Sequence, residues 1–341
     1  MDIRLCKRDC ERWDSYISQS EQASFFHQWA YQHVVARTFG HSPYYLTAWQ
    51  DADICGILPL FIVHSWLFGR FLVSLPFVDY GGICSDDKDA EWALWQEAVR
   101  LARQEGVQYI ELRQRYSGSL SLPVQTHKVN LVLPLSVNAE MVWQRLDSKV
   151  RNQVRKAQKS GLTFEAGDLQ KLADFYQVWS KNMRDLGTPA YPLAFFRNFL
   201  EAFPNTSEIL LVRHGEKPVG AGISIYFKNT VEVPWASSLR EYFAYCPNNL
   251  LYWEAVRRAC ERDCQEFHFG RSTVGSGNYF FKKQWGAQDK QLYYLYWLAE
   301  GNKMPDFDPH SSKYRLAVAL WRRLPLALAN VLGPWIVRGI S

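Results

Sequence analysis

The pattern of apolar and polar positions repeats in the two halves of the chain. Residues 46–62 and 211–227 each contain an apolar strand, a polar turn and a second apolar strand. Residues 94–113 and 251–271 each have apolar spacings of three and four, typical of an amphipathic helix, and then a short strand ending in Arg. The pattern predicts a β-hairpin, a helix and a strand in each half.

An aromatic-rich helical segment precedes each hairpin, at residues 25–40 and 175–187. The order helix, hairpin, helix, strand therefore recurs at an offset of about 160 residues, which indicates an internal duplication. We expect an α+β fold made of two similar domains. Their expected bounds are residues 1–138 and 139–305, with a basic, apolar tail over residues 306–341.

The composition adds little to this prediction. The 341 residues are 48% apolar and 21% charged, as in ordinary globular proteins, and their number favours two cores over one. The seven cysteines form no CxxC pair and no histidines follow at zinc-ligand spacing, so no metal site is expected. The i, i+4 spacings of Cys6/Cys10 and Cys260/Cys264 predict reduced thiols on helical faces, and hence a reducing compartment.

The start of the chain has no apolar signal core, and no run of about 18 apolar residues occurs. We therefore expect a cytoplasmic protein. The formal net charge of +5 is modest, so the local distribution of charge matters more than the total.

The second half has a basic segment that the first half lacks. Between Arg145 and Lys159 there are six basic residues and one acid, Asp147. The segment predicts a helix that stops at Gly161. Such a helix is either a solvated surface or an anion site for phosphate, pyrophosphate or a nucleic-acid backbone, because Arg forks match phosphate oxygens. Its candidate binding residues are Lys149, Arg151, Asn152, Arg155 and Lys156.

Two further stretches are confined to the second half. Residues 181–192, KNMRDLGTPAYP, favour a rigid structural loop after a helix. Residues 270–286, GRSTVGSGNYFFKKQWG, combine glycines that allow a close backbone approach with Arg271, Lys282 and Lys283. We interpret this stretch as an active-site loop, although it matches neither phosphate-binding glycine motif.

Two single residues on predicted strands are also candidates for chemistry. Glu232 lies near Trp235, where a strand carboxylate can serve as a base or hold an ammonium group. His268 lies in an apolar strand, where a packed histidine is the favoured interpretation.

Four motifs together resemble one family over nearly the whole chain: KVRNQVRKAQKSG, NMRDLGTP, FGRSTVGSGNYFFKKQWGA and WRRLPLALANVLGP. They are similar to the FemAB-like proteins of the exosortase/PEP-CTERM system, within the FemABX and GNAT-like acyltransferase group. The resemblance implies two tandem GNAT-like domains. The first would bind the acceptor or act as a scaffold, and the second would be catalytic, its cleft bordered by the first.

The resemblance also implies an activity. Members of the wider group transfer an aminoacyl group from aminoacyl-tRNA to an amine of a peptidoglycan precursor, and a Phe-Lys pair supplies a lysine that steadies the reacting carbonyl. Here that pair is Phe281-Lys282. The expected catalytic residues are Lys282 and Glu232. The expected substrate-binding residues are Lys149, Arg151, Asn152, Arg155, Lys156, Trp235, Arg271, Ser272, Gly277, Tyr279 and Phe281.

The chain departs from the family pattern in two respects. It lacks the coiled-coil insertion of some Fem proteins, and the coenzyme-A signature Q/R-x-x-G-x-G/A is not recognisable. The donor, a co-substrate and not a bound cofactor, is therefore either aminoacyl-tRNA, with tRNA as a carrier partner, or acyl-CoA. The expected acceptor is a nucleotide- or lipid-linked precursor of the cell envelope or of an exopolysaccharide.

Two alternatives from other classes stay open at this stage. One is a non-catalytic module that recruits a lipid- or nucleotide-linked glycan to assembly machinery. The other is an RNA-binding protein that uses the basic helix. Residues 311–341 hold five Lys or Arg residues and no acid. This tail either packs across the two domains or makes a peripheral contact with an anionic inner membrane.

Overall fold

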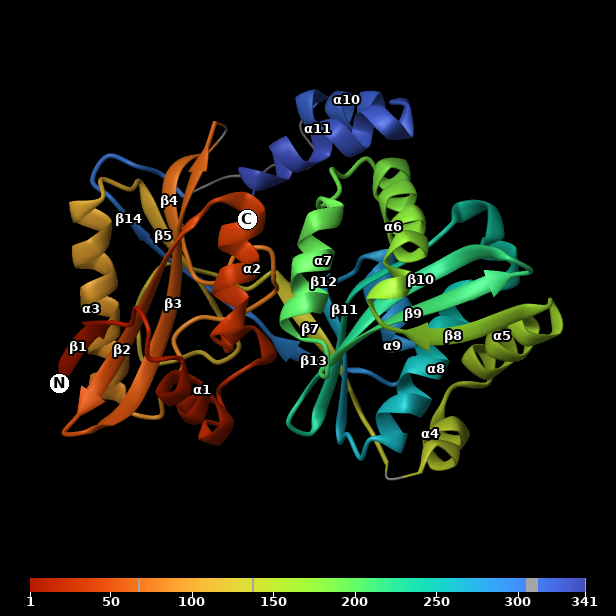
Figure 1. Ribbon diagram of the computed structural model, residues 1–341, viewed down its shortest axis with the longest axis horizontal. Coiled ribbons are helices and arrows are strands. Elements are labelled where there is room, and N and C mark those ends of the chain that lie inside the picture. The colour runs from red at the N-terminus through yellow and green to blue at the C-terminus, as the bar shows by residue number, and fades with distance from the viewer. Residues whose placement is uncertain (67, 137, 305–311, 341) are drawn as a thin grey trace. The chain divides into compact units, whose positions relative to one another are not determined.

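The computed structural model describes residues 1–66, 68–136, 138–304 and 312–340. The chain forms two compact units, each with its own sheet (Figure 1). The first unit comprises Met1–Val129, Gln291–Phe307 and Arg338–Ser341, and the second comprises Asn130–Lys290 and Asp308–Val337. The linear bounds at 138/139 and 305/306 remain a proposal about where each copy of the duplication begins in the sequence.

The first unit is a seven-stranded sheet with helices packed against it. Its elements are β1 (Asp2–Leu5), α1 (Cys10–Gln19), η1 (Phe25–His27), α2 (Ala30–Phe39), β2 (Ser42–Gln50), β3 (Asp53–Ser65), β4 (Gly69–Val73), α3 (Lys88–Gln104), β5 (Tyr109–Gln114), β6 (Val124–Gln125) and β14 (Tyr293–Leu298). The strand order is β1-β2-β3-β4-β5-β14-β6.

The second unit also has a seven-stranded sheet. Its elements are β7 (Lys128–Pro134), α4 (Ala139–Arg145), α5 (Ser148–Lys159), β8 (Leu162–Gly167), η2 (Leu169–Lys171), α6 (Leu172–Leu186), α7 (Leu193–Ala202), β9 (Ser207–His214), β10 (Lys217–Phe227), β11 (Thr230–Ser238), η3 (Arg240–Tyr245), α8 (Pro247–Glu261), β12 (Glu266–Thr273), α9 (Gly277–Lys283), β13 (Gln288–Gln291), α10 (Ser312–Trp321) and α11 (Leu326–Arg338). The strand order is β13-β7-β12-β11-β10-β9-β8.

The two sheets confirm the predicted duplication. In each, a first strand and a hairpin lead to a fourth strand, and a helix then crosses to a fifth strand that runs parallel to the fourth. The sixth position differs in origin: β14 fills it in the first sheet and β7 in the second. The first sheet takes its sixth strand, β14, from after the second unit, whereas β7 directly precedes the rest of the second unit. The return of β14 makes the first unit discontinuous in sequence, and the C-terminal helices make the second one so. The fold class is α+β with two GNAT-like domains, as expected.

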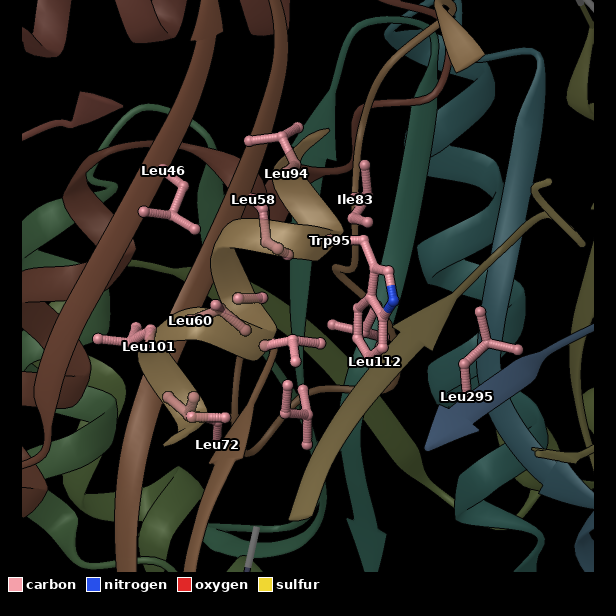
Figure 2. Close-up of a cluster of buried hydrophobic side chains, with 14 of the residues drawn as sticks. Leu46, Leu58, Leu60, Leu72, Ile83, Leu94, Trp95, Leu101, Leu112 and Leu295 are labelled. Carbon is pink, nitrogen blue, oxygen red and sulfur yellow. The ribbon is translucent and has the colours of Figure 1, made fainter. Parts of the chain in front are cut away.

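One core cluster of the first unit lies between α3 and the sheet (Figure 2). Leu58, Leu72 and Leu94 have no exposed surface, and Trp95 is 3% exposed. Burying one such side chain contributes roughly 1.5–3 kcal/mol. The helix begins at Asp87, whose carboxylate accepts hydrogen bonds from two main-chain N–H groups of the first turn.

Helices cover both faces of the second sheet. Glu208 of β9 points to α8, where it pairs with Arg258 at 2.5 Å. Its neighbour Ile209 points to the opposite face, because successive strand residues alternate. Across the sheet, Ile209 of β9 is paired with Ile223 of β10, and Ile223 is paired with Trp235 of β11, so the three side chains share one face. Trp235 packs against α7 on that face. The α6–α7 side and the α8 side are therefore different faces of one sheet.

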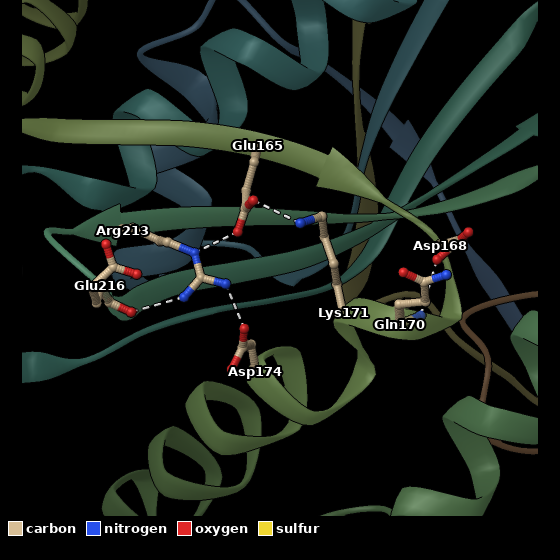
Figure 3. Close-up of polar contacts among 7 residues, drawn as sticks. All are labelled: Glu165, Asp168, Gln170, Lys171, Asp174, Arg213 and Glu216. Atoms are coloured by element: carbon tan, nitrogen blue, oxygen red, sulfur yellow. Dashed lines mark hydrogen bonds and ion pairs between the residues drawn. The ribbon is translucent and has the colours of Figure 1, made fainter.

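An ion cluster joins β8, η2 and α6 to β9 (Figure 3). The Arg213 guanidinium contacts Glu165 and lies 2.5 Å from Asp174, and the Lys171 ammonium lies 2.6 Å from Glu165. Hydrogen bonds from Lys171 and then Arg213 lower the pKa of Glu165. The cluster fixes the sheet edge to the helix layer.

Two local predictions are wrong. Residues 270–286 are not a loop: they form the end of β12, a turn and helix α9, because the Ser276 hydroxyl caps the helix by accepting from Tyr279 N at 3.2 Å. The cysteine pairs do not share helical faces either. Cys6 precedes α1 and Cys264 follows α8, although all seven cysteines are free thiols.

Candidate functional site

The parallel pairing of β11 with β12 stops after the first three residues of each strand. The last Cα partners are Glu232 and His268. Beyond them β11 continues to Ser238 and β12 continues to Thr273. Ligands of parallel sheets bind at the carboxyl ends of strands that separate in this way. The ends of β11 and β12 therefore define the candidate site of the second unit.

A β-bulge in β11 lies next to Glu232, the predicted base, and decides which sheet face this side chain is on. In the pairing with β10, Trp235 is opposite Ile223 and Glu232 is opposite Ile225. The β10 residues are two apart and the β11 residues are three apart, so β11 contains one extra residue here. Pro234 lies within the bulge, where a missing N–H costs no ladder hydrogen bond. Because of the extra residue, Glu232 and Trp235 share one sheet face.

That shared face is the one covered by α7. Trp235 is 3% exposed and packs edge-on against Phe195, Phe196 and Phe199. Trp235 thus belongs to an aromatic core, which is a different environment from the substrate contact expected for it. Glu232 is buried beside this core.

Further polar side chains lie on the same face. His268 is level with Glu232 on the neighbouring parallel strand, so both side chains point to one side. Its Nδ1 accepts from Asn130 Nδ2 at 3.2 Å, and its Nε2 donates to Glu266 at 2.9 Å. His268 is 3% exposed, which confirms the expected buried histidine. These hydrogen bonds fix its ring next to Glu232.

Two serines continue the polar face toward the strand ends. Ser272 of β12 is 5% exposed, and its hydroxyl has no hydrogen-bond partner within the described residues. Ser237 of β11 accepts a hydrogen bond from Asn182 of α6 at 2.9 Å. A buried hydroxyl without a partner is costly in an apolar environment, and the Ser272 hydroxyl oxygen is closed to solvent.

Lys282 projects from α9 onto the end of β12. Its side chain is only 7% exposed. Its ammonium donates to the main-chain oxygens of Gly270 at 2.9 Å and Arg271 at 3.0 Å. Both carbonyls belong to the part of β12 that has left the pairing with β11. The protein therefore holds a desolvated cation at the separating strand ends.

The rest of α9 is tied to its surroundings. Tyr279 donates to Asp289 at 2.9 Å and Lys283 pairs with Asp289 at 3.1 Å, and the hydrogen bond to Asp289 raises the pKa of Tyr279. Phe281 is half-buried, and its ring centroid lies 5.7 Å from that of Tyr252 in α8. Two more expected binding residues are exposed: Arg271, near the end of β12, and Gly277, the first residue of α9.

The predicted basic helix is α5, and it lies at another part of the sheet. It begins at Asp147 and ends before Gly161, whose left-handed φ of 76° confirms the predicted stop. It packs against α8 and β8. Four spacings separate β8 from β12, which corresponds to about 19 Å. The structure thus does not place the basic helix at the Lys282 ammonium.

Most of the candidate side chains on α5 face solvent. Lys149, Asn152, Arg155 and Lys156 are exposed, and the Arg155 guanidinium lies 5.5 Å from the centroid of Trp143. Arg151 is half-buried, and its Nε is closed to solvent and has no hydrogen-bond partner in the part of the chain that the structure describes. The helix is therefore a solvent-exposed cationic surface suited to an extended anion.

The first unit differs at the equivalent strand ends. The β4–β5 pairing also stops after three pairs, at Val73 and Glu111. There, however, Ser74 N donates to Glu111 O at 3.0 Å, and Gly81 N donates to Arg113 O at 3.0 Å. The connection after β4 therefore bonds to β5 and closes the gap.

A cavity of about 400 Å³ lies beside the end of β5 in the first unit. Its lining includes the carboxylates of Asp86 and Glu91, the Gln114 amide and the Tyr116 ring. Glu91 is buried and accepts from the Ser119 hydroxyl at 2.5 Å. The lining is largely polar and contains three carboxylates and the Lys88 ammonium, so it suits a hydroxyl-rich or amine-bearing ligand.

Comparisons with known proteins agree with this geometry. A model of the acetyltransferase (GNAT) domain matches residues 144–283, which include β11, β12 and α9. No curated protein matches the chain. The fold and site thus define a protein with the GNAT-like acyltransferase fold.

Solved structures extend the similarity to both units. FemX is 14% identical, with a TM-score of 0.67 over 86% of this chain and 97% of its own. The C-terminal domain of a putative lysylphosphatidylglycerol synthetase from Agrobacterium fabrum is 12% identical, with a TM-score of 0.55 over 84% and 91%. A tandem GNAT protein from the clavulanic acid biosynthesis pathway is 11% identical, with a TM-score of 0.55 over 89% and 99%.

Two further properties concern the described residues only. No group of three His, Cys, Asp or Glu side chains among them is arranged to hold a metal ion. Within those same ranges, no helix combines the length and apolar character needed to cross a bilayer.

Sequence reasoning missed part of the polar face. Asn130 lies on β7, far from the duplicated motifs, and only the sheet order brings it next to His268. The bulge had a detectable signal, since Pro234 inside an apolar strand indicates a bulge or an edge.

Proposed function

We propose that the protein is an acyltransferase that moves an aminoacyl group to an amine of a cell-envelope or exopolysaccharide precursor. The observation that supports this most strongly is the buried Lys282 ammonium, held at the ends of β11 and β12. A fixed cation in a water-poor site is suited to stabilising the negative charge that acyl transfer creates.

In the proposed reaction, the acceptor amine attacks the carbonyl carbon of the donor ester. A C–N bond forms, and the carbonyl oxygen takes the negative charge next to the Lys282 ammonium. Collapse of this intermediate breaks the C–O ester bond and releases the hydroxyl of the tRNA ribose. Glu232, on the same site, accepts the proton that the attacking nitrogen loses, and the leaving oxygen takes up a proton.

The basic surface of α5 supports aminoacyl-tRNA as the donor. Arg155 and Lys156 are exposed and suit the phosphates of an extended nucleic acid. Residues 239–246, which connect β11 to α8, contain no glycine and thus no coenzyme-A signature. FemX and the lysylphosphatidylglycerol synthetase domain share the fold, which is consistent with aminoacyl transfer.

The cavity of the first unit supports a role in acceptor binding. Its acidic lining, with Asp86 and Glu91, favours an amine, while Gln114 and Tyr116 suit sugar hydroxyls and a sugar face. The resemblance to FemAB-like proteins of the exosortase system agrees with a lipid- or nucleotide-linked sugar acceptor. Such precursors are made in the cytoplasm, where we place the protein.

A donor test on the purified protein examines this proposal. Labelled aminoacyl-tRNA and labelled acyl-CoA are each offered with a lipid-linked precursor fraction. We expect label to move to the precursor from aminoacyl-tRNA and not from acyl-CoA. An Arg155→Gln/Lys156→Gln variant should raise the KM for aminoacyl-tRNA and flatten its salt dependence, while a Lys7→Gln control should change neither.

Transfer from acyl-CoA alone would replace the proposed donor. Binding of the precursor without transfer from either donor would contradict an enzyme and favour the recruiting module.

A further inference from the structure

Helix α11 exposes a row of large apolar side chains. Leu328, Val331, Leu332 and Trp335 are 51, 63, 44 and 72% exposed. Their spacings of three, one and three residues place them on a single helical face. One aligned face of this kind differs from the scattered exposed apolar residues of an ordinary surface.

The opposite face of α11 is packed against the second unit. Ala329, Gly333 and Val337 are buried. Gly333 lies on the main chain of Ala190, so close that a Cβ on the glycine would be 3.1 Å from the Ala190 carbonyl oxygen. The exposed row is therefore the outer face of a docked helix.

Helix α10 and the connection to α11 are anchored at the same place. The Arg184 guanidinium donates to Leu324 O at 2.8 Å, and Arg322 donates to Leu186 O at 3.2 Å. The segment NMRDLGTPAYP, residues 182–192, therefore supports the C-terminal helices, and we call it the platform. Figure 1 shows α10 and α11 beyond the ends of α6 and α7.

The pair α10–α11 is both apolar and cationic. On α10, Leu316 and Leu320 are 61 and 58% exposed. Arg315 and Arg323 are exposed, and residues 312–340 contain no acid. With 10 and 13 residues, the two helices are too short to span a bilayer.

We infer that the α10–α11 pair, Ser312–Arg338, is a surface that docks on an anionic membrane. An interfacial helix places its apolar row among the acyl chains while arginines bind the lipid phosphates. The absence of any acid in residues 312–340 favours a phosphate-rich surface over a protein partner, whose interface normally mixes charges. The platform already holds α10 and α11 in their helical form on the second unit, so the two helices do not have to fold when they meet the membrane.

Vesicle sedimentation of the full chain tests this inference. The probes are large vesicles of phosphatidylcholine alone and of phosphatidylcholine with phosphatidylglycerol. We expect binding to the anionic vesicles, weakened at least tenfold by Val331→Ser/Trp335→Ser. Trp66→Ser is the matched control, since Trp66 is 78% exposed in the first unit and its loss should not weaken binding.

Charge is tested separately. Arg315→Gln/Arg323→Gln should weaken binding to anionic vesicles by about 30-fold, the effect of removing two interfacial charges of about 1 kcal/mol each. Thermal melting of each variant confirms that it is folded.

Three results would overturn the inference: no binding of the wild-type chain to anionic vesicles, binding that survives the Val331→Ser/Trp335→Ser change, or self-association that this change abolishes. The last result would assign the row to a second copy of the chain. The inference does not depend on the proposed acyl transfer, because vesicle binding needs neither donor nor acceptor.

Discussion

Glu232 and His268 are the last partners of the parallel pair β11–β12, and both side chains are buried on one face of the sheet. Their counterparts in the first unit, Val73 and Glu111, are followed by a connection whose Ser74 bonds back to the Glu111 carbonyl. In the second unit the strand end is instead occupied by the ammonium of Lys282. The two copies of the duplicated fold thus differ at equivalent strand ends: main-chain hydrogen bonds cover the end of β5 in the first unit, and the Lys282 ammonium binds the end of β12 in the second.

Replacement of the proposed base should slow transfer without unfolding the protein. Glu232→Gln keeps the size of the side chain and removes the proton acceptor, so we expect kcat to fall about 10²–10⁴-fold. The KM for the donor should change little, and the acidic limb of the pH–rate profile should disappear. Steady-state kinetics across pH measure both effects.

The matched control is Glu266→Gln, which changes the other carboxylate next to His268. It should keep most of the rate. If Glu232→Gln retains the wild-type pH profile, Glu232 is not the base.

The ion pair of buried Glu208 with half-buried Arg258 should make the free energy of unfolding depend on pH in acid. Burial alone raises the pKa of Glu208, but the hydrogen bonds from Arg258 and Tyr226 outweigh it and the net pKa is lowered. A carboxyl with a lowered pKa contributes stability above its unfolded pKa, near 4.5, and loses it as the pH falls through the folded value.

Glu208→Gln should therefore cost about 2 kcal/mol at neutral pH, because it leaves the half-buried Arg258 guanidinium without its charge partner. The cost should shrink below pH 4.5. Urea unfolding at pH 7 and pH 4 measures it, and an equal cost at both values would contradict the assignment.

The buried His27 should affect stability in a different pH range. Burial lowers its pKa from 6.5 to about 4, and the hydrogen bond to Gly82 O only partly offsets this. Between these values the unfolded chain binds a proton that the folded chain does not. Stability should thus fall as the pH drops from 6.5 to 4, by about 3 kcal/mol for this residue. In His27→Gln, unfolding measured over the same range should show a shallower slope, and an unchanged slope would contradict the assignment.

The contact of Gly333 with Ala190 gives a prediction about the C-terminal helices. Gly333→Val forces a branched side chain against main-chain atoms 3.1 Å away, so α11 should lose its platform. We expect faster cleavage within residues 326–338 in limited proteolysis, with the rest of the second unit still protected. Leu332→Val, on the exposed face, is the control and should not accelerate cleavage.

Much of the fold could be predicted from the sequence. The apolar runs of residues 46–62 and 211–227, each interrupted by a polar turn, gave both hairpins, because the strands are largely buried on both faces and the turn between them is exposed. The origin of the sixth strands could not be predicted. β7 and β14 are both short apolar strands, and only tertiary packing decides which sheet each one joins.

The candidate site was predicted less completely. Lys282 was found through the resemblance, but its contacts depend on a helix that begins at Ser276 within a glycine-rich stretch. Trp235 was expected at the ligand, although the α7 phenylalanines enclose it. The basic helix formed as expected, yet it packs against α8 and the edge strand β8, and not at the ends of β11 and β12 that define the candidate site.

The measurement that tests the central claim most directly is the single-turnover rate of aminoacyl transfer by the wild type, Lys282→Ala and Lys283→Ala. Lys283 is the adjacent lysine, paired with Asp289 and exposed. We predict that Lys282→Ala lowers the rate by about 10²–10³-fold, the usual cost of removing one oxyanion-stabilising group, while its thermal midpoint shows a folded protein. Lys283→Ala should keep a rate near that of the wild type. Equal rates for all three proteins would contradict a role of Lys282 in the chemistry.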